Sequence, residues 1–205
     1  AENWPEYLRI DAPPESLALL RDPGQGIILA AGHLGNWDLA GQILSQLKPV
    51  TGIARRMNNP LAERLLRQRR IQNRLTLIPK YDADPTRFLR VVKEGGVMAF
   101  MIDQHAWNSR LVLKFFGSPA MTHATPAMLH LTTGAPLLFG NCIREGRLRY
   151  RMKVSPPLRF ERSGDRQRDT RMIMQTLTGM LEDDIRTWPE QYLWAHRRWQ
   201  DQHVK

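Results

Sequence analysis

Apolar and polar positions alternate in blocks along this chain, and the blocks predict strands separated by helices. The clearest strand is the apolar run 26–31, Gly-Ile-Ile-Leu-Ala-Ala, which follows a Pro23-Gly24 breaker. The next segment has the apolar spacing of a helix that Asn36 or Asp38 can cap and that ends before Pro49. Residues 26–48 therefore predict a strand, a loop and a helix in succession.

The same alternation continues to the carboxyl end. Further strands are predicted at residues 52–54, 75–78, 97–102, 111–116, 136–143 and 147–154, the last two joined as a hairpin at 145–146. Further helices are predicted to begin at 59–60 and 84–85 and to cover 173–188, and residues 163–168 are expected to be a polar surface loop. Strands separated by helices favour an α/β fold with one mixed, mostly parallel central sheet flanked by helices.

Two ionisable residues lie where the first strand ends. His33 follows the strand, and Asp38 falls in the first turn of the predicted helix. In such a unit both side chains can point into one crevice at the carboxyl end of the sheet. A carboxylate that holds one nitrogen of a histidine leaves the other nitrogen able to act as a general base. The structural alternative is a hydrogen-bonded histidine and a helix-capping aspartate.

No serine nucleophile elbow accompanies this pair. The nucleophile is therefore expected to belong to a substrate.

The charge balance predicts anionic partners. The 205 residues carry a formal net charge of +10, so nucleic acid, an acidic membrane surface and a phosphorylated substrate or carrier are all compatible with the composition. Arginines are densest at 55–56 and 64–74, where phosphate binding and a solvated basic face are both open interpretations. No recognisable helix-turn-helix, zinc-finger or RNA-binding aromatic motif is present, so nucleic-acid binding is kept only as the alternative from another class.

Metal and disulfide chemistry have weak sequence support. Cys142 is the single cysteine, so no intrachain disulfide can form. His105 and His123 could approach Asp103, but they do not form a compact ligand set, and we expect no metal. We find no apolar run long enough to span a bilayer, so any membrane contact of these residues is expected to be peripheral.

Five segments, taken together and in order, resemble the lipid A biosynthesis acyltransferases, the late lauroyl and myristoyl transferases and their relatives. They are HLGNWD, MIDQ, KFFGSPAMT, TTGAPL and PEQYLWAHRRW, and the resemblance extends from about Leu8 to Trp199. It implies a glycerolipid acyltransferase-like fold. It also implies a membrane-associated enzyme that moves a fatty acyl chain from acyl carrier protein, or coenzyme A, to a hydroxyl of a glycolipid such as a lipid A precursor.

The resemblance also implies roles for individual residues. His33 and Asp38 match the family's catalytic pair, with His33 as general base and Asp38 orienting it. Arg70 resembles a family arginine near the active site, and Asp103 resembles a strand-end acidic residue. We add Asn36, Gly35, Arg55 and Arg56 as candidate substrate-binding residues. For the acyl transfer that the resemblance implies, backbone N–H groups around Gly35 or a nearby arginine are candidates for binding the oxyanion. The segment 189–199 could line the polar part of the site or close the core.

The chain departs from the family at particular points. Asp38 stands where glutamate is more frequent, Thr125 stands where glycine is frequent, and the sequence contains no hydrophobic amino-terminal anchor. We expect one acyltransferase domain over residues 1–205, a monomer with no cofactor beyond its acyl thioester. We expect it to bind the cytoplasmic face of a bacterial inner membrane peripherally. The enzymatic alternative is an acyl-thioester hydrolase, which would act without a glycolipid.

Overall fold

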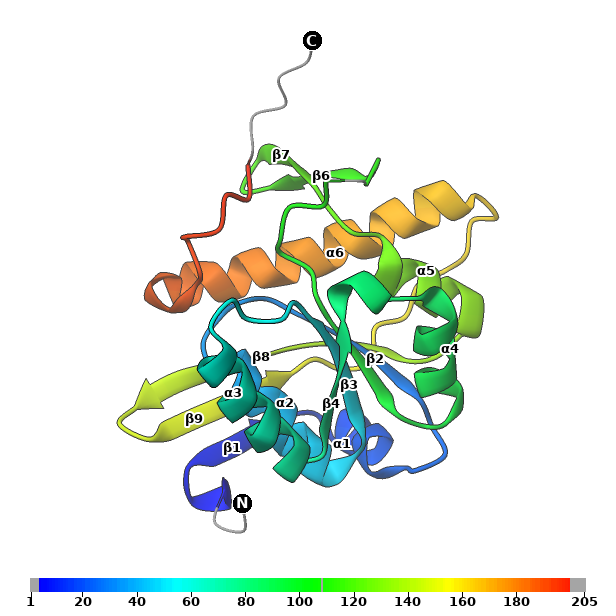
Figure 1. Ribbon diagram of the computed structural model, residues 1–205. Helices are drawn as coiled ribbons and strands as arrows, with labels where there is room; N and C mark the ends of the chain where they lie inside the picture. Colours follow the sequence, from blue (N-terminus) through cyan, green and yellow to red (C-terminus); the bar gives the residue numbers. More distant parts are fainter. Residues whose placement is uncertain (1–3, 108, 200–205) are drawn as a thin grey trace.

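The computed structural model describes residues 4–107 and 109–199, and a seven-stranded sheet forms its centre (Figure 1). The strand order is β1-β9-β8-β2-β5-β3-β4. All neighbouring pairs are parallel except β8 and β9, which form an antiparallel hairpin. The strands are β1 (Leu8–Asp11), β2 (Ile27–Ala31), β3 (Val50–Ala54), β4 (Leu75–Pro79), β5 (Val97–Met101), β8 (Leu137–Gly146) and β9 (Arg149–Val154).

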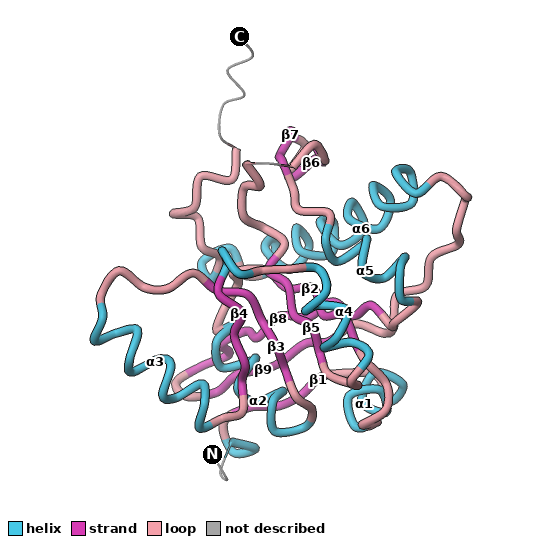
Figure 2. The backbone as a smooth tube through the Cα atoms, turned by 45° about the vertical axis from the view of Figure 1, so that its right-hand side comes forward, coloured by secondary structure: helices cyan, strands magenta, loops and turns pink. Residues whose placement is uncertain are grey.

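Helices cover both faces of the sheet (Figures 1 and 2). They are α1 (Pro14–Arg21), α2 (Trp37–Leu47), α3 (Pro60–Gln72), α4 (Pro85–Lys93), α5 (Thr125–Thr133) and α6 (Arg166–Thr187). Side chains of α4, α5 and α6 enter one hydrophobic cluster, and side chains of α1 and α2 enter a second. In β2, Ile28 belongs to the first cluster and Ile27 to the second, because successive side chains of a strand point to opposite faces.

The structure confirms the predicted α/β class with one mixed, mostly parallel sheet. It also confirms the strand before His33, the Asn36 cap of α2 and the helices that begin at Pro60 and Pro85. The three helices each begin at a capping side chain or at a proline in the first turn, and both signals can be recognised in the sequence. Local sequence was therefore enough to predict where these helices begin.

Several expectations about the elements were wrong or incomplete. Strand β6 (Val112–Phe115) does not join the central sheet but pairs with β7 (Ser118–Met121) in a separate two-stranded sheet. The segment 163–168 is not all loop, because Asp165 caps α6 and the helix begins at Arg166. Elements β1, α1, β7 and α5 were not predicted. These elements are short, and in α5 the apolar residues are not concentrated on one face of the helix, so the sequence shows no clear helical periodicity there.

Among the described residues, no helix combines the length and the apolar character that crossing a bilayer requires.

Candidate active site

His33 and Asp103 meet because their strands are neighbours in register. Strands β2 and β5 are parallel, and Ala31 pairs with Met101. Two residues further along each strand direction, His33 and Asp103 leave the carboxyl edge of the sheet side by side. Nδ1 of His33 lies 2.8 Å from Oδ1 of Asp103, and the backbone N–H of His33 donates to Oδ2 at 2.8 Å. Both carboxylate oxygens are therefore used to fix one histidine.

The buried carboxylate determines which ring nitrogen is available. Asp103 is only 3% exposed, so its ionised form favours a hydrogen on Nδ1 of His33 and leaves a lone pair on Nε2. Nε2 lies 3.5 Å from Nε2 of Gln104, at the limit of a hydrogen bond. The edge of the Trp37 ring packs against the imidazole with ring centroids 5.0 Å apart. This geometry presents an oriented imidazole whose free nitrogen can accept a proton.

Asp38 does not hold His33 in this structure, contrary to the expectation from the sequence. Its Oδ1 accepts from Nε and Nη2 of Arg70 at 2.8 and 2.7 Å, and its Oδ2 accepts from Gln42 at 2.6 Å. The reason is directional: Asp38 lies on the side of α2 that faces α3, whereas Asp103 leaves the strand adjacent to β2. The two predicted residues Asp38 and Arg70 are thus brought together, but as a pair separate from His33 and Asp103.

The loop between β2 and α2 uses its own polar groups for folding. Gly35 has φ +66°, and a Cβ at this position would lie 2.0 Å from the carbonyl oxygen of Cys142. The N–H groups of Gly35 and Asn36 donate to Gln191 and Cys142, and Oδ1 of Asn36 caps α2 through Leu39 N–H. Gly35 N–H is therefore already occupied, which corrects its suggested role as an oxyanion donor.

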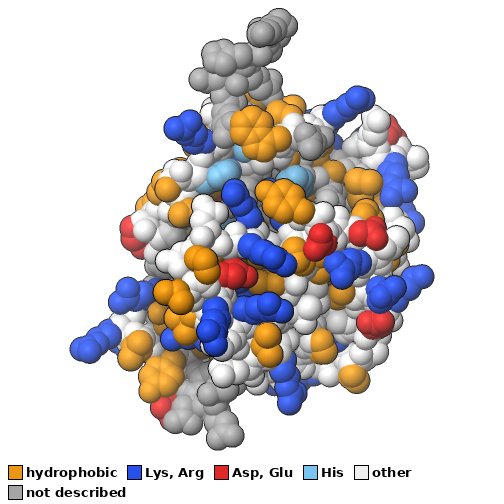
Figure 3. Space-filling view, in the orientation of Figure 1, with side chains coloured by type: hydrophobic (Ala, Val, Ile, Leu, Met, Phe, Trp, Pro, Cys, Tyr) orange, Lys and Arg blue, Asp and Glu red, His pale blue; other side chains and the backbone are white. Residues whose placement is uncertain are grey.

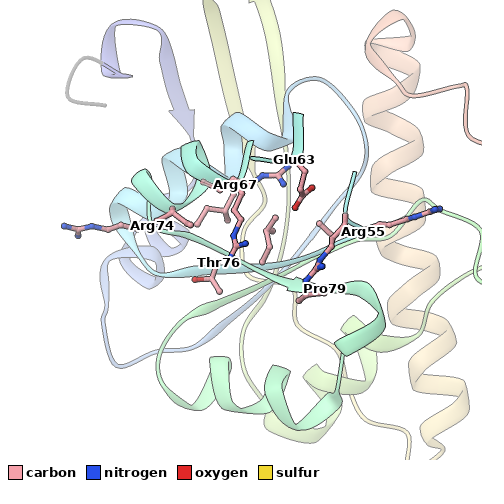
Figure 4. Close-up of a pocket in the computed structure, with 12 residues that line it drawn as sticks. Arg55, Glu63, Arg67, Arg74, Thr76 and Pro79 are labelled. Atoms are coloured by element: carbon pink, nitrogen blue, oxygen red, sulfur yellow. The ribbon is translucent and has the colours of Figure 1, made fainter. Parts of the chain in front are cut away.

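Arginines gather in a pocket between α3 and strands β3 and β4, beside the Asp38–Arg70 pair. The pocket has a volume of about 540 Å³ and contains one carboxylate, that of Glu63 (Figure 4). Arg55 and Arg56 directly follow β3, so the carboxyl edge that carries His33 also carries them. The predicted residues Arg55, Arg56 and Arg70 all line this pocket, and so do Arg67 and Arg74 of the arginine-rich run 64–74.

The carboxyl-terminal segment closes the site from outside the sheet. Leu193 N–H donates to the carbonyl of His33 at 3.0 Å, and Nε2 of His196 accepts from His105 N–H at 2.9 Å. Burial raises the pKa of the Tyr192 phenol, and the negative charge of Asp103 raises it further. Arg198 is buried and donates to Thr122 and to the carbonyl of Met121. The segment 189–199 thus fixes the loops that carry His33 and Asp103.

The suggested metal ligands do not form a ligand set. Over the part of the chain that the structure describes, no group of three or more histidine, cysteine or acidic residues could hold a metal ion. Burial, followed by nearby positive charges, lowers the pKa of His123. Cys142 is a buried residue of β8, and burial raises the pKa of its thiol to about 12.

The structure is thus an α/β protein with a histidine–aspartate pair at the carboxyl edge of its sheet and an arginine pocket next to the Asp38–Arg70 pair. The chain belongs to the bacterial lipid A biosynthesis acyltransferase family, whose family model matches residues 14–201.

Individual relatives support the same family. A phosphatidylinositol mannoside acyltransferase of Mycolicibacterium smegmatis is 29% identical over 182 residues, covering 87% of this chain and 58% of the relative. A protein of the same name from Mycobacterium tuberculosis is 30% identical, covering 86% and 55%. A lipid A biosynthesis palmitoleoyltransferase of Escherichia coli is 24% identical, covering 88% and 58%. The chain therefore spans little more than half the length of these relatives.

One solved structure is also similar. The 1-acyl-sn-glycerophosphate acyltransferase PlsC from Thermotoga maritima matches with a TM-score of 0.45 and 13% identity, covering 86% of this chain and 73% of that chain.

Proposed function

We propose that this protein transfers a fatty acyl chain from an acyl thioester to a hydroxyl of a glycolipid, with His33 as the general base. The observation that carries the proposal is the contact between Nδ1 of His33 and the buried carboxylate of Asp103, which leaves Nε2 as the proton acceptor. Asp103 takes the orienting role that the sequence had suggested for Asp38. Membership in the acyltransferase family supplies the reaction class.

The proposed reaction needs no covalent acyl-enzyme. Nε2 of His33 removes the proton from the acceptor hydroxyl as its oxygen attacks the thioester carbonyl carbon. The tetrahedral intermediate then collapses, the carbon–sulfur bond breaks, and the leaving thiolate takes the proton from the imidazolium. An ester and a free thiol result. Asp103 stabilises the imidazolium while it exists, as a carboxylate does in other histidine-based acyl-transfer sites.

The oxyanion is proposed to lie near the first turn of α2. N–H groups in the first turn of a helix have no intrahelical acceptor, and the helix dipole favours negative charge there. Asp38 would oppose an anion at this position, but Arg70 pairs with it and offsets its charge. Pairing with Arg70 therefore reduces the negative electrostatic potential that Asp38 would otherwise create near the reacting carbonyl.

The arginine pocket is proposed to take the anionic part of the acceptor. Arginine can bind phosphate with two parallel hydrogen bonds, and Arg55 and Arg56 line the pocket. Arg70 also lines it, and because its Nε and Nη2 donate to Asp38, its remaining N–H groups are the ones proposed to contact the anion. The relatives named above act on phosphatidylinositol mannoside or in lipid A biosynthesis, so a phosphorylated glycolipid such as a lipid A precursor is the proposed acceptor class. The donor is proposed to be acyl carrier protein or coenzyme A carrying the acyl chain.

The proposed setting follows from the acceptor. A glycolipid acceptor resides in a membrane, and the net charge of +10 suits an anionic leaflet. We therefore propose that one acyltransferase domain, residues 1–205, works as a monomer on the cytoplasmic face of a bacterial inner membrane. No further cofactor enters the proposed chemistry.

A labelled acyl donor tests this function. The protein is incubated with labelled acyl carrier protein or acyl-coenzyme A, with and without extracted glycolipid dispersed in detergent. Label that enters lipid only when glycolipid is present supports transfer. Free fatty acid released at the same rate without glycolipid would instead establish the hydrolase. Mass spectrometry of the labelled lipid identifies the acceptor, and absence of both products would overturn the proposed enzyme class.

A further inference from the structure

Helix α3 differs from the other α-helices in the described part of the chain because none of its residues is buried. It lies at one side of the molecule, beyond the edge strand β4 (Figure 2). Leu61 is 77% exposed, Leu65 is 51% exposed, and Ile71 is 64% exposed. Ile71 belongs to the lining of the arginine pocket, whereas Leu61 and Leu65 do not. Two large apolar side chains exposed one turn apart on a helix leave apolar surface in water.

The polar residues of α3 are arranged around this apolar surface. Successive residues of a helix are about 100° apart, so Leu61 and Leu65 lie one turn apart on the same side. The same spacing places Arg64 on one flank of the two leucines and Arg69 on the other. Basic and hydrophobic side chains are interleaved over this part of the surface (Figure 3). Exposed apolar side chains flanked by arginines are one feature of helices that lie in the plane of a membrane interface.

The opposite side of α3 faces the candidate active site. Arg70 reaches from this side to the carboxylate of Asp38 at 2.7 Å. Glu63 and Arg67, together with Arg70, line the arginine pocket. One helix therefore separates a pocket suited to an anionic group from an exposed surface of leucine and arginine.

We propose that α3 docks this protein on an anionic lipid bilayer, with Leu61 and Leu65 entering the boundary between headgroups and acyl chains. Arg64 and Arg69 then pair with lipid phosphates on either side. This inference rests on the proposed function in one respect: a lipid acceptor requires the enzyme to reach a membrane. Docking through α3 would hold the arginine pocket close to the headgroups.

Charge complementarity alone would also suit an acidic protein such as an acyl carrier protein. The exposed leucines favour the bilayer, because insertion below the headgroups removes Leu61 and Leu65 from water, whereas a strongly acidic protein surface would pair chiefly with the arginines. Arginine side chains can also extend from a partly inserted helix to the phosphate level. The surface is a single convex helix rather than a groove, which suits a planar partner.

Site-specific labelling tests the proposal. Cys142 is fully buried, and its thiol pKa of about 12 keeps it protonated, so an introduced surface cysteine can be labelled selectively. Leu61→Cys and Leu65→Cys each receive a polarity-sensitive dye. Met172→Cys, on α6 and 41% exposed, is the matched helical control.

The labelled proteins are mixed with vesicles of phosphatidylglycerol and phosphatidylcholine, with vesicles of phosphatidylcholine alone, and with purified acyl carrier protein. We expect a blue shift at both α3 positions with anionic vesicles and none at the α6 position. Unshifted dyes at both α3 positions, or equal shifts at all three, would overturn the proposal. A shift with acyl carrier protein but not with vesicles would assign the surface to a protein partner instead.

Charge variants provide a second measurement. Arg64→Gln and Arg69→Gln should each weaken binding to anionic vesicles about five-fold more than Arg168→Gln on α6, since an interfacial arginine contributes about 1 kcal/mol. Equal weakening by all three variants would contradict docking through α3. Acyl transfer to detergent-dispersed glycolipid is measured in parallel. If vesicle binding behaves as expected while transfer is absent, the proposed function fails and the docking inference stands.

Discussion

His33 and Asp103 are separated by 70 positions in the sequence, yet Nδ1 of one lies 2.8 Å from Oδ1 of the other. The second oxygen of Asp103 accepts the backbone N–H of His33, so ring and backbone are held by a single carboxylate. Asp38, only five positions from His33, pairs instead with Arg70. The carboxylate that contacts His33 is therefore the one distant in sequence, not the one nearby.

His33→Ala should abolish acyl transfer while leaving the fold intact. The imidazole provides the only proposed proton acceptor, and its side chain contributes little to either hydrophobic cluster. Transfer of label to glycolipid and the circular-dichroism melting curve measure the two effects. Near-normal turnover in a folded variant would contradict the assignment of the general base.

Asp103→Asn should lower turnover by roughly 10²- to 10⁴-fold, because an amide cannot stabilise the imidazolium and favours the wrong tautomer. Asp38→Asn should have a clearly smaller effect on turnover, since Asp38 does not contact His33 in the structure. Steady-state kcat values of the two variants, with melting temperatures as the control, make the comparison. A larger loss in Asp38→Asn would return the orienting role to that residue.

Arg70→Ala should raise the KM for the glycolipid by about ten-fold, which corresponds to the loss of a charge-assisted hydrogen bond of about 1.5 kcal/mol. Arg168→Ala is the matched control, because Arg168 is exposed on α6 and far along the chain from the pocket. Equal effects of the two substitutions on KM would indicate that general surface charge, rather than the arginine pocket, binds the acceptor.

Binding to anionic vesicles should be reversible and should decrease as salt is added. Screening shortens the reach of surface charge to roughly 8–10 Å at 0.1–0.15 M salt, and the net charge of +10 supplies most of the attraction. Vesicle co-sedimentation over a salt series measures this. If equal amounts of protein sediment with neutral and anionic vesicles at high salt, insertion of apolar side chains dominates the binding. That result would contradict a binding driven mainly by charge.

Gly35→Ala should destabilise the protein by at least about 1–3 kcal/mol. The left-handed φ of +66° strains any other residue, and the added Cβ would collide with the Cys142 carbonyl. Gly179→Ala is the control: this helical position has no neighbouring atom within 4 Å, so alanine should stabilise by about 0.5–1 kcal/mol. Urea unfolding of both variants measures the difference. Unchanged stability in Gly35→Ala would contradict the tight loop geometry.

Local sequence determined much of the scaffold. The apolar run before His33 predicts β2, and the capping residue Asn36 and the spacing of apolar residues predict α2. Pro60 and Pro85 mark the first turns of α3 and α4. These signals act over a few residues, because capping and helical spacing concern neighbouring backbone groups. The placement of His33 at a strand end follows from them.

Tertiary structure decided which groups are partners. The sequence singled out Asp103 at a strand end, but only the parallel register of β2 and β5 places its carboxylate beside His33. The packing of α3 against α2 and β4 turns Asp38 toward Arg70, and it gathers arginines from three segments around one pocket. Hydrophobic periodicity specifies which face of an element is buried, but strand order and register depend on contacts between distant segments.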